Sequence, residues 1–293
     1  MKKRLFSIIL SVAICFSALA FTACSGEIEQ SSKIQRMIMT FDFYDAAGNV
    51  VDTKNVQAKL YLNFAPETTK RFIALAEDGY FDNTCVSDVD TGYFEFGSYE
   101  YVDGNLTAKS FDTEKYPTLK GEFSKNGWVG NKLTASAGAL IFKHDTEGSG
   151  ELSKYDTAKG TIIVALSTTS KFSASEYCVF GKLCSDDAED NPSSLVSDSS
   201  VNRSGKSSLA VAQTVADLVS NDGVRTYYYE KEGVFYTKVT EDGETEYFAG
   251  TTTDGEALTG DELEKIQDLV SDADPSLKTI PYTKVVIKSI KKK

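Results

Sequence analysis

The stretch from Ala58 to Thr84, AKLYLNFAPETTKRFIALAEDGYFDNT, constrains the fold more than any other part of the chain. Its first residues alternate between apolar and polar, which is typical of a half-buried strand. Pro66 and Glu67 suit the first turn of a helix, where a missing N–H costs nothing and an acidic side chain complements the helix dipole. Gly79 then ends the helix. The stretch predicts a strand, a short helix and a turn into a second strand.

The rest of the chain is rich in predicted strands. Alternating runs at 37–43 and 56–64 flank a turn at 46–49, which predicts a β-hairpin. Further elements are strands at 93–101, 139–142, 161–166, 178–183 and 285–290, and a second helix at 209–219. Many strands with two helices predict a mostly β fold, either a barrel or a sandwich, capped by the helices.

Residues 1–23 are predicted to be a signal peptide and not part of the fold. Three cations at 2–4 precede an apolar run, 5–21, that is too short to favour a membrane-spanning helix. The run closes on Phe-Thr-Ala before Cys24, which resembles a bacterial lipobox. We expect cleavage before Cys24, lipid attached to its thiol and a tether over 24–34, so that the protein is exported and held on the membrane by the anchor alone. An ordinary signal peptide or an uncleaved anchor is the alternative.

Charge and composition exclude several function classes. Loss of the three signal-peptide cations takes the formal net charge from −12 to −15, so neither nucleic acid nor anionic headgroups are expected to attract the domain. Cys85, Cys178 and Cys184 are an odd set that describes no disulfide framework, although a Cys178–Cys184 or Cys85–Cys178 bridge stays open. The single histidine, His144, is expected in a solvated loop, and no metal or other cofactor is expected.

About 260 residues follow the tether, which suits one large domain with insertions. We place this domain at 35–290 and expect a monomer. Residues 185–208 are acidic and Ser-rich, which predicts a long flexible loop. Residues 222–260 hold three β-favourable runs separated by Glu-Gly and Asp-Gly turns, which predicts an inserted β-meander, with a short helix near 263–269. The many tyrosines of the meander either pack on the main domain or form a recognition surface for a partner.

Four blocks, in order along the chain, resemble cyclophilin-type peptidyl-prolyl isomerases. They are FAPET and GYFDNT within 64–84, KGEFSKNG at 120–127, YCVFGKL at 177–183 and VVIKSI at 285–290. The resemblance implies a closed eight-stranded antiparallel barrel with a helix at each end. It also implies isomerisation of X-Pro bonds without a cofactor, on proline-containing peptide segments or an exported protein.

The resemblance fails at the catalytic position. Asp88 stands where the family has its catalytic arginine, and Phe96 stands where it has a glutamine after the apolar pair that is Tyr93 and Phe94 here. A prolyl bond rotates through a twisted amide, and a fixed cationic donor can stabilise that state. Asp88 supplies no such donor when it is ionised. Lys143 lies close by in the alignment and is the candidate replacement cation.

Three further residues complete the site that the resemblance implies. Ile163 stands for a pocket phenylalanine, Phe172 lies near the Trp-Leu corner of the family, and Tyr177 lies near its histidine. The aromatic residues of this set can equally be core packing. Two functions follow: a peptidyl-prolyl isomerase-like foldase of exported proteins with weak or altered activity, or a non-catalytic lipoprotein that binds or scaffolds a protein partner on the same barrel.

Overall fold

The computed structural model describes residues 34–45, 47–90, 92–145, 153–168, 171–184, 208–220, 227–231, 233–241, 243–251, 253, 255–271, 278–281 and 284–293. The expectations for the signal peptide, Cys24, the tether and nearly all of 185–208 lie outside the described residues. Within the described ranges, no helix combines the length and the apolar character needed to cross a membrane.

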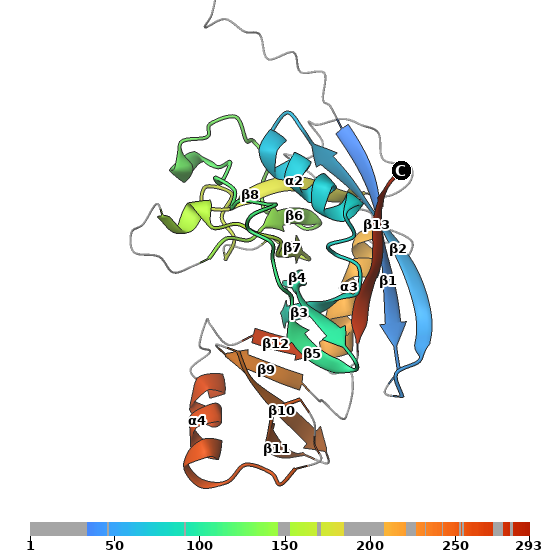
Figure 1. Cartoon of the computed structure of the whole chain (residues 1–293), viewed down its shortest axis with the longest axis vertical. Coiled ribbons are helices and arrows are strands. Elements are labelled where there is room, and N and C mark those ends of the chain that lie inside the picture. The colour runs from blue at the N-terminus through green and yellow to red at the C-terminus, as the bar shows by residue number, and fades with distance from the viewer. Residues whose placement is uncertain are drawn as a thin grey trace, which may run out of the picture. The chain divides into compact units, whose positions relative to one another are not determined.

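Eight antiparallel strands close into a barrel (Figure 1). In the order of their hydrogen-bonded neighbours they are β3, β13, β1, β2, β8, β6, β7 and β4, and pairing of β3 with β4 completes the circle. A short strand, β5, forms a hairpin with β4. The bounds are β1 Ile34–Tyr44, β2 Val50–Tyr61, β3 Thr84–Asp90, β4 Tyr93–Val102, β5 Asn105–Ala108, β6 Ala139–Phe142, β7 Ile162–Ala165, β8 Cys178–Cys184 and β13 Val285–Lys292. The predicted eight-stranded barrel is confirmed.

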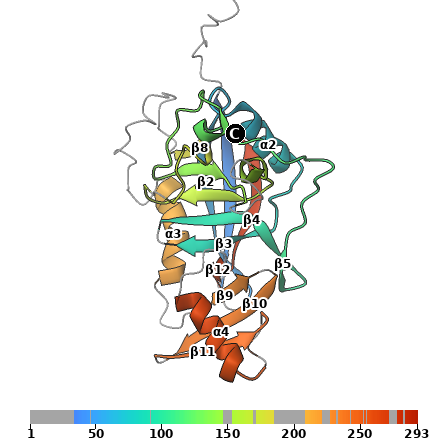
Figure 2. The ribbon, with the colours of Figure 1, turned by 90° about the vertical axis from the view of Figure 1, so that its left-hand side faces the viewer.

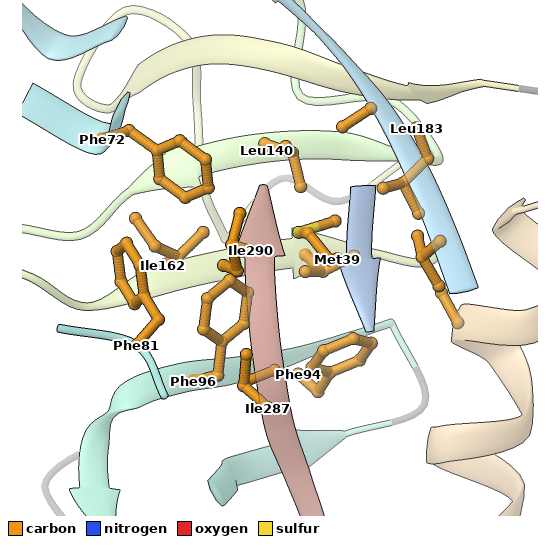
Figure 3. Packing of buried hydrophobic residues seen from close by; sticks show 14 of the residues in the cluster. Met39, Phe72, Phe81, Phe94, Phe96, Leu140, Ile162, Leu183, Ile287 and Ile290 are labelled. Atoms are coloured by element: carbon orange, nitrogen blue, oxygen red, sulfur yellow. The ribbon is translucent and has the colours of Figure 1, made fainter. Parts of the chain in front are cut away.

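Alternation along the strands fills the inside of the barrel. Met37, Met39 and Phe41 of β1 are at most 1% exposed, whereas the residues between them are partly exposed. Figure 3 shows this core, which includes Met39 of β1, Phe94 of β4 and Ile287 of β13. Apolar burial stabilises a fold by about 25 cal/mol per Å², so this shared interior is the main term that holds the strands together.

Two helices cover the core, as the sequence predicts. They are α2, Pro66–Glu77, and α3, Ser208–Ser220. The ring of Phe72 in α2 lies 5.1 Å from that of Phe180 in β8, between ring centroids. Leu209, Ala212 and Val215 of α3 bury into the same cluster. The apolar stripe predicted for the first helix is therefore the face that packs on the barrel, and the view of Figure 2 shows α2 and α3 flanking the strands.

A second, four-stranded sheet follows α3, in the order β11, β10, β9 and β12. Its strands are β9 Tyr227–Lys231, β10 Val234–Glu241, β11 Glu244–Ala249 and β12 Lys278–Pro281. The helix α4, Gly260–Ser271, lies between β11 and β12 in the sequence. The predicted three-run meander is confirmed, and β12 joins it by pairing with β9. Ile266 of α4 is fully buried and packs with Tyr229 and Tyr247 of the sheet.

The small sheet contacts the barrel through aromatic and apolar side chains. The Tyr99 hydroxyl of β4 donates a hydrogen bond to the Glu230 carboxylate of β9, and the Tyr99 ring lies 6.1 Å from that of Phe235. Ile280 of β12 packs against Cys85 of the barrel. These aromatic residues of the insertion are therefore used in packing, which was the first of the two interpretations of the tyrosine-rich segment.

The three cysteines form neither of the disulfides left open by the sequence. Cys85, Cys178 and Cys184 all carry free thiols. Burial raises the pKa of both Cys85 and Cys178 to about 12, so these two thiols stay protonated at neutral pH.

The N-terminus of α2 is capped from a distance. The side chain of Glu122, only 5% exposed, accepts hydrogen bonds from the backbone N–H groups of Glu67 and Thr68, at 3.1 and 2.8 Å. The first N–H groups of a helix have no partner within the helix, and a carboxylate also complements the helix dipole. Glu122 therefore connects the segment 120–127 to α2, the first of the two predicted helices.

We expect Glu122→Ala to lower the free energy of unfolding by about 2 kcal/mol, because it leaves two helix N–H groups without their charged acceptor. Urea denaturation measures the change. Glu67→Gln is the matched control, because the Glu67 side chain is 64% exposed and pairs only with a neighbouring exposed lysine. Equal stability of Glu122→Ala and Glu67→Gln would contradict this role of Glu122.

Candidate functional site

The side chains of β4 divide between the two faces of the barrel wall. Phe94 and Phe96 are both fully buried in the barrel core, where each contacts Phe41 edge-to-face at 6.2 and 6.5 Å between ring centroids. Figure 3 shows both rings inside the core. Tyr93 belongs to a separate cluster, and Glu95 pairs with Lys143 instead of the core. The core-packing interpretation therefore holds for Phe94 and Phe96, and the outward residues are Tyr93 and Glu95.

The two faces of β4 also change which residue corresponds to the glutamine that the resemblance implies. The sequence alignment put Phe96 there, but a side chain in the core cannot reach a ligand on the outside. Strand residues alternate between faces, so Glu95 is the neighbour that faces the other way. A carboxylate, which only accepts hydrogen bonds when it is ionised, thus occupies the outer face at this point of the strand.

Four of the predicted site residues come together on the outer face of the barrel: Tyr93, Ile163, Phe172 and Tyr177. We refer to these four residues as the outer cluster. The ring of Phe172 stands edge-on to Tyr93 at 4.8 Å and to Tyr177 at 5.3 Å between centroids. Such edge-to-face pairs are favourable arrangements of aromatic rings. Four of the six residues predicted to bind a substrate are therefore adjacent in space, although they come from β4, β7 and the chain before β8.

The outer cluster is closely packed. Ile163 is fully buried, Tyr93 and Phe172 are each 3% exposed, and Tyr177 is 8% exposed. Burial, with Asp88 and Glu95 nearby, raises the pKa of Tyr93, so its phenol stays protonated. These rings contact one another instead of lining an open groove, and a proline ring would have to displace or part them to stack on their faces.

Lys143, the candidate cation, lies beside the outer cluster between two carboxylates. Its ammonium forms an ion pair with Glu95, whose side chain is 1% exposed, and its Nζ lies 3.9 Å from Oδ2 of Asp88. Burial disfavours the charged amine, but Glu95 and then Asp88 outweigh it and raise the pKa of Lys143. The Lys143 ammonium is therefore charged, and the carboxylates of Glu95 and Asp88 compensate its charge.

Asp88, which lies near the Lys143 ammonium, stands at an irregularity in β3. Its φ is 46°, in the left-handed region that Asp tolerates better than most residues, and the pairing of β3 with β4 shifts register between Ser87 and Asp90. The Tyr93 hydroxyl donates a hydrogen bond to Oδ2 of Asp88 at 3.2 Å. The residue at the expected arginine position thus accepts hydrogen bonds where the family would donate them.

Two residues of this region were not identified from the sequence. Lys171 donates a hydrogen bond to the Tyr93 hydroxyl, and its ammonium lies 4.4 Å from the centre of the Tyr93 ring. A cation over an aromatic face is attracted by the ring. Glu95 could have been found from the strand alternation, because it is the charged residue within the aromatic run at 93–96. Lys171 lies in a connecting segment, where no periodicity marks it.

His144 does not lie in a solvated loop, as the sequence predicted. It is 4% exposed, and its ring stacks on Tyr177 at 4.4 Å between centroids with an interplanar angle of 16°. Its Nε2 lies 3.0 Å from the backbone oxygen of Glu176. The polar flanking residues misled the prediction, and His144 instead supports the outer cluster from behind Tyr177.

We expect Lys143→Met to lower the free energy of unfolding by about 3 kcal/mol, because it leaves Glu95 charged and buried without its partner. Adding Glu95→Leu to the same protein should restore most of that stability. Urea denaturation of the two variants and the wild type measures both effects. A double variant no more stable than Lys143→Met would contradict the pairing.

The same ion pair predicts a pH dependence. Because the folded protein raises the pKa of Lys143 above its ordinary value of 10.5, the stabilisation is complete below pH 10.5 and is lost as the pH rises through the folded value. The difference in unfolding free energy between wild type and Lys143→Met should be constant from neutral pH to about 10 and shrink above that. A difference that shrinks already between pH 6 and 8, about four units lower, would contradict the assignment.

Comparisons with solved structures found two cyclophilins that are similar to this chain. One solved relative is a Cryptosporidium parvum cyclophilin type peptidyl-prolyl cis-trans isomerase in the presence of the dipeptide Ala-Pro, with 19% identity over 54% of this chain and 84% of that chain, and a TM-score of 0.35. A cyclophilin from Hirschia baltica has 12% identity over 70% of this chain and 80% of its own, with a TM-score of 0.32. No curated protein matches.

The similarity to a protein family is confined to residues 49–188. They match the family model described as cyclophilin type peptidyl-prolyl cis-trans isomerase/CLD. The matched range holds the hairpin strand β2, the helix α2 and every residue of the outer cluster. This part of the chain, just under half of it, is similar to the cyclophilin-type peptidyl-prolyl cis-trans isomerase family.

Proposed function

We propose that this protein is a foldase of exported proteins that binds proline-containing segments and isomerises their prolyl bonds slowly. In this proposal it is held on the cell membrane, outside the cytoplasm, by a lipid on Cys24. The observation that carries the proposal is the placement of Lys143. It is a cation on the outer face of the barrel, beside the outer cluster, but it is paired with Glu95 and faces Asp88.

The chemistry explains why such a site would be slow. The twisted amide keeps a carbonyl oxygen that accepts hydrogen bonds and gains a lone pair on nitrogen, so a fixed donor lowers the barrier. Loss of one such donor costs about 10²–10³-fold in measured systems. Lys143 can donate, but its hydrogen bond to Glu95 would have to be shared or broken first.

Binding of a proline ring has independent support in the kinds of side chain present. Tyr93, Phe172 and Tyr177 are aromatic and Ile163 is apolar, which are the kinds of side chain that a proline ring packs against. Because all four are buried, binding would require Phe172 or Lys171 to move aside, which adds a cost to affinity. The Cryptosporidium parvum protein was crystallised in the presence of Ala-Pro, and we extend that ligand class to this chain as part of the proposal.

A second candidate function is a non-catalytic binder or scaffold on the same barrel. One observation favours it: a pocket of about 590 Å³ lies away from the outer cluster, between Leu106 of β5 and the small sheet. Val234, Phe235 and Leu258 supply apolar lining, and Glu262 and Lys265 of α4 stand at its side. Such a pocket could hold a partner segment without any prolyl chemistry.

A protease-coupled assay with a prolyl peptide tests the main proposal. The wild type should accelerate isomerisation weakly, and Lys143→Ala should remove that acceleration because Lys143 is the proposed donor to the twisted amide. Glu95→Gln should raise the rate about tenfold, which corresponds to about 1.4 kcal/mol, because it frees the ammonium from its buried counter-charge.

Asp52→Asn is the control variant for this assay, because Asp52 is a half-exposed residue of β2 that pairs only with Lys54. It should behave as the wild type. If the wild type and Glu95→Gln both leave the uncatalysed rate unchanged, the foldase proposal fails and the non-catalytic binder is favoured. If the wild type is fast and Lys143→Ala equally fast, the role of Lys143 is wrong.

A further inference from the structure

A short segment with exposed apolar side chains lies between β5 and β6. It consists of residues 127–130, Gly-Trp-Val-Gly, and we call it the Trp128 tip. Trp128 is 37% exposed and Val129 is 74% exposed, and both are among the few large apolar residues that the described surface leaves open. Trp128 is also the only tryptophan of the whole sequence. Neither residue takes part in the core or in the outer cluster.

The indole of Trp128 is held in place. Its Nε1–H donates a hydrogen bond to the backbone oxygen of Phe64 at 2.9 Å. Its ring also lies over Gly130, where a Cβ atom would come within 3.2 Å of Nε1. Glycine at 130 thus leaves room for the ring. An exposed indole that is fixed by its own polar group presents the rest of its apolar surface outward at little cost in side-chain entropy.

The Trp128 tip lies at the end of the barrel where the described chain starts. Ile34, the first described residue, pairs with Tyr61 across the β1–β2 ladder. The ring of Tyr61 lies 6.2 Å from that of Phe64, whose backbone oxygen accepts the Trp128 hydrogen bond. Ile34 lies ten positions after Cys24, and even a fully extended chain of ten residues spans at most about 35 Å. A lipid on Cys24 would keep this end of the barrel near the bilayer.

The charges around the tip are of both signs. Lys120, Lys125 and Lys132 of the same segment are exposed, and Glu122 is buried where it caps the N-terminus of α2, but the exposed carboxylate of Asp156 accepts a hydrogen bond from the neighbouring Asn126. Lys125 is partly neutralised by an ion pair with Glu176. The net charge of −15 expected after cleavage predicts repulsion from anionic headgroups, but charges farther than about 10 Å are screened in salt, so this repulsion is weak at the tip.

We propose that the Trp128 tip docks into the headgroup region of the bilayer that carries the Cys24 lipid, and so fixes the orientation of the barrel on the membrane. Tryptophan favours this region because its ring is apolar and its edge is polar. The inference rests on the lipid anchor of the proposed function. Phe64 and Leu133 next to the tip pack on the outer cluster, so docking would hold the candidate site at the membrane edge, where an exported chain emerges.

The test uses the complete lipidated protein reconstituted into vesicles of phosphatidylcholine and phosphatidylglycerol, with emission read from the single tryptophan. In vesicles of brominated phosphatidylcholine the Trp128 emission should lose most of its intensity, and aqueous iodide should quench it little. Val129→Asp should restore the emission in brominated vesicles, because a carboxylate at the tip opposes insertion. Circular dichroism of Val129→Asp, expected to match the wild type, reports whether it folds.

A tryptophan that keeps its emission in brominated vesicles, and is quenched by iodide, would overturn the docking. Wild-type protein that fails to float with the vesicles would overturn both the anchor and the docking. The prolyl isomerisation assay does not depend on the vesicles, so it separates these failures from failure of the foldase activity. Lys132→Gln removes one cation near the tip. It should lower the quenching of Trp128 by brominated lipid in vesicles that contain the anionic phosphatidylglycerol, and not in vesicles of phosphatidylcholine alone.

Discussion

The alternation of side chains across the wall of the barrel is the constraint on which the rest of the structure depends. Along β4 it sends Phe94 and Phe96 into the core and leaves Tyr93 and Glu95 outside. A shift of pairing by one residue would exchange these sets and bury the carboxylate of Glu95 in the barrel. The stability of the fold and the composition of the candidate site are therefore fixed by the same register.

The ion pair on the outer face gives the site its distinct character. Glu95 is nearly fully buried, and Lys143 is the cation that compensates its charge. The ion pair stabilises the fold, but it makes Lys143 a poor hydrogen-bond donor to a ligand because its ammonium is already bound to a buried carboxylate. Asp88 and the Tyr93 hydroxyl extend the same network. The site therefore stands on a closed eight-stranded barrel, while its electrostatics differ from what prolyl isomerisation favours.

Much of the fold was predictable because it depends on local patterns. The alternating runs at 37–43 and 56–64, and the proline-initiated helix, gave strands and a helix within a few residues of β1, β2 and α2. The site was less predictable, because alignment by short blocks does not fix which face a residue occupies. Phe96 is the example: its neighbour Glu95 carries the outward position. His144 and Lys171 depend on tertiary contacts with Tyr177 and Tyr93, and no local sequence pattern encodes those contacts.

The central claim is that the outer face of the barrel, and not the small sheet, receives proline-containing segments. NMR titration of the protein with an Ala-Pro-containing peptide tests it most directly, with the methyl signal of Ile163 and the ring signals of Phe172 and Tyr229 as reporters. The account predicts that the Ile163 and Phe172 signals shift together and saturate, and that Tyr229, packed under α4, stays unchanged. Shifts confined to Tyr229 and its neighbours, with Ile163 unaffected, would contradict it.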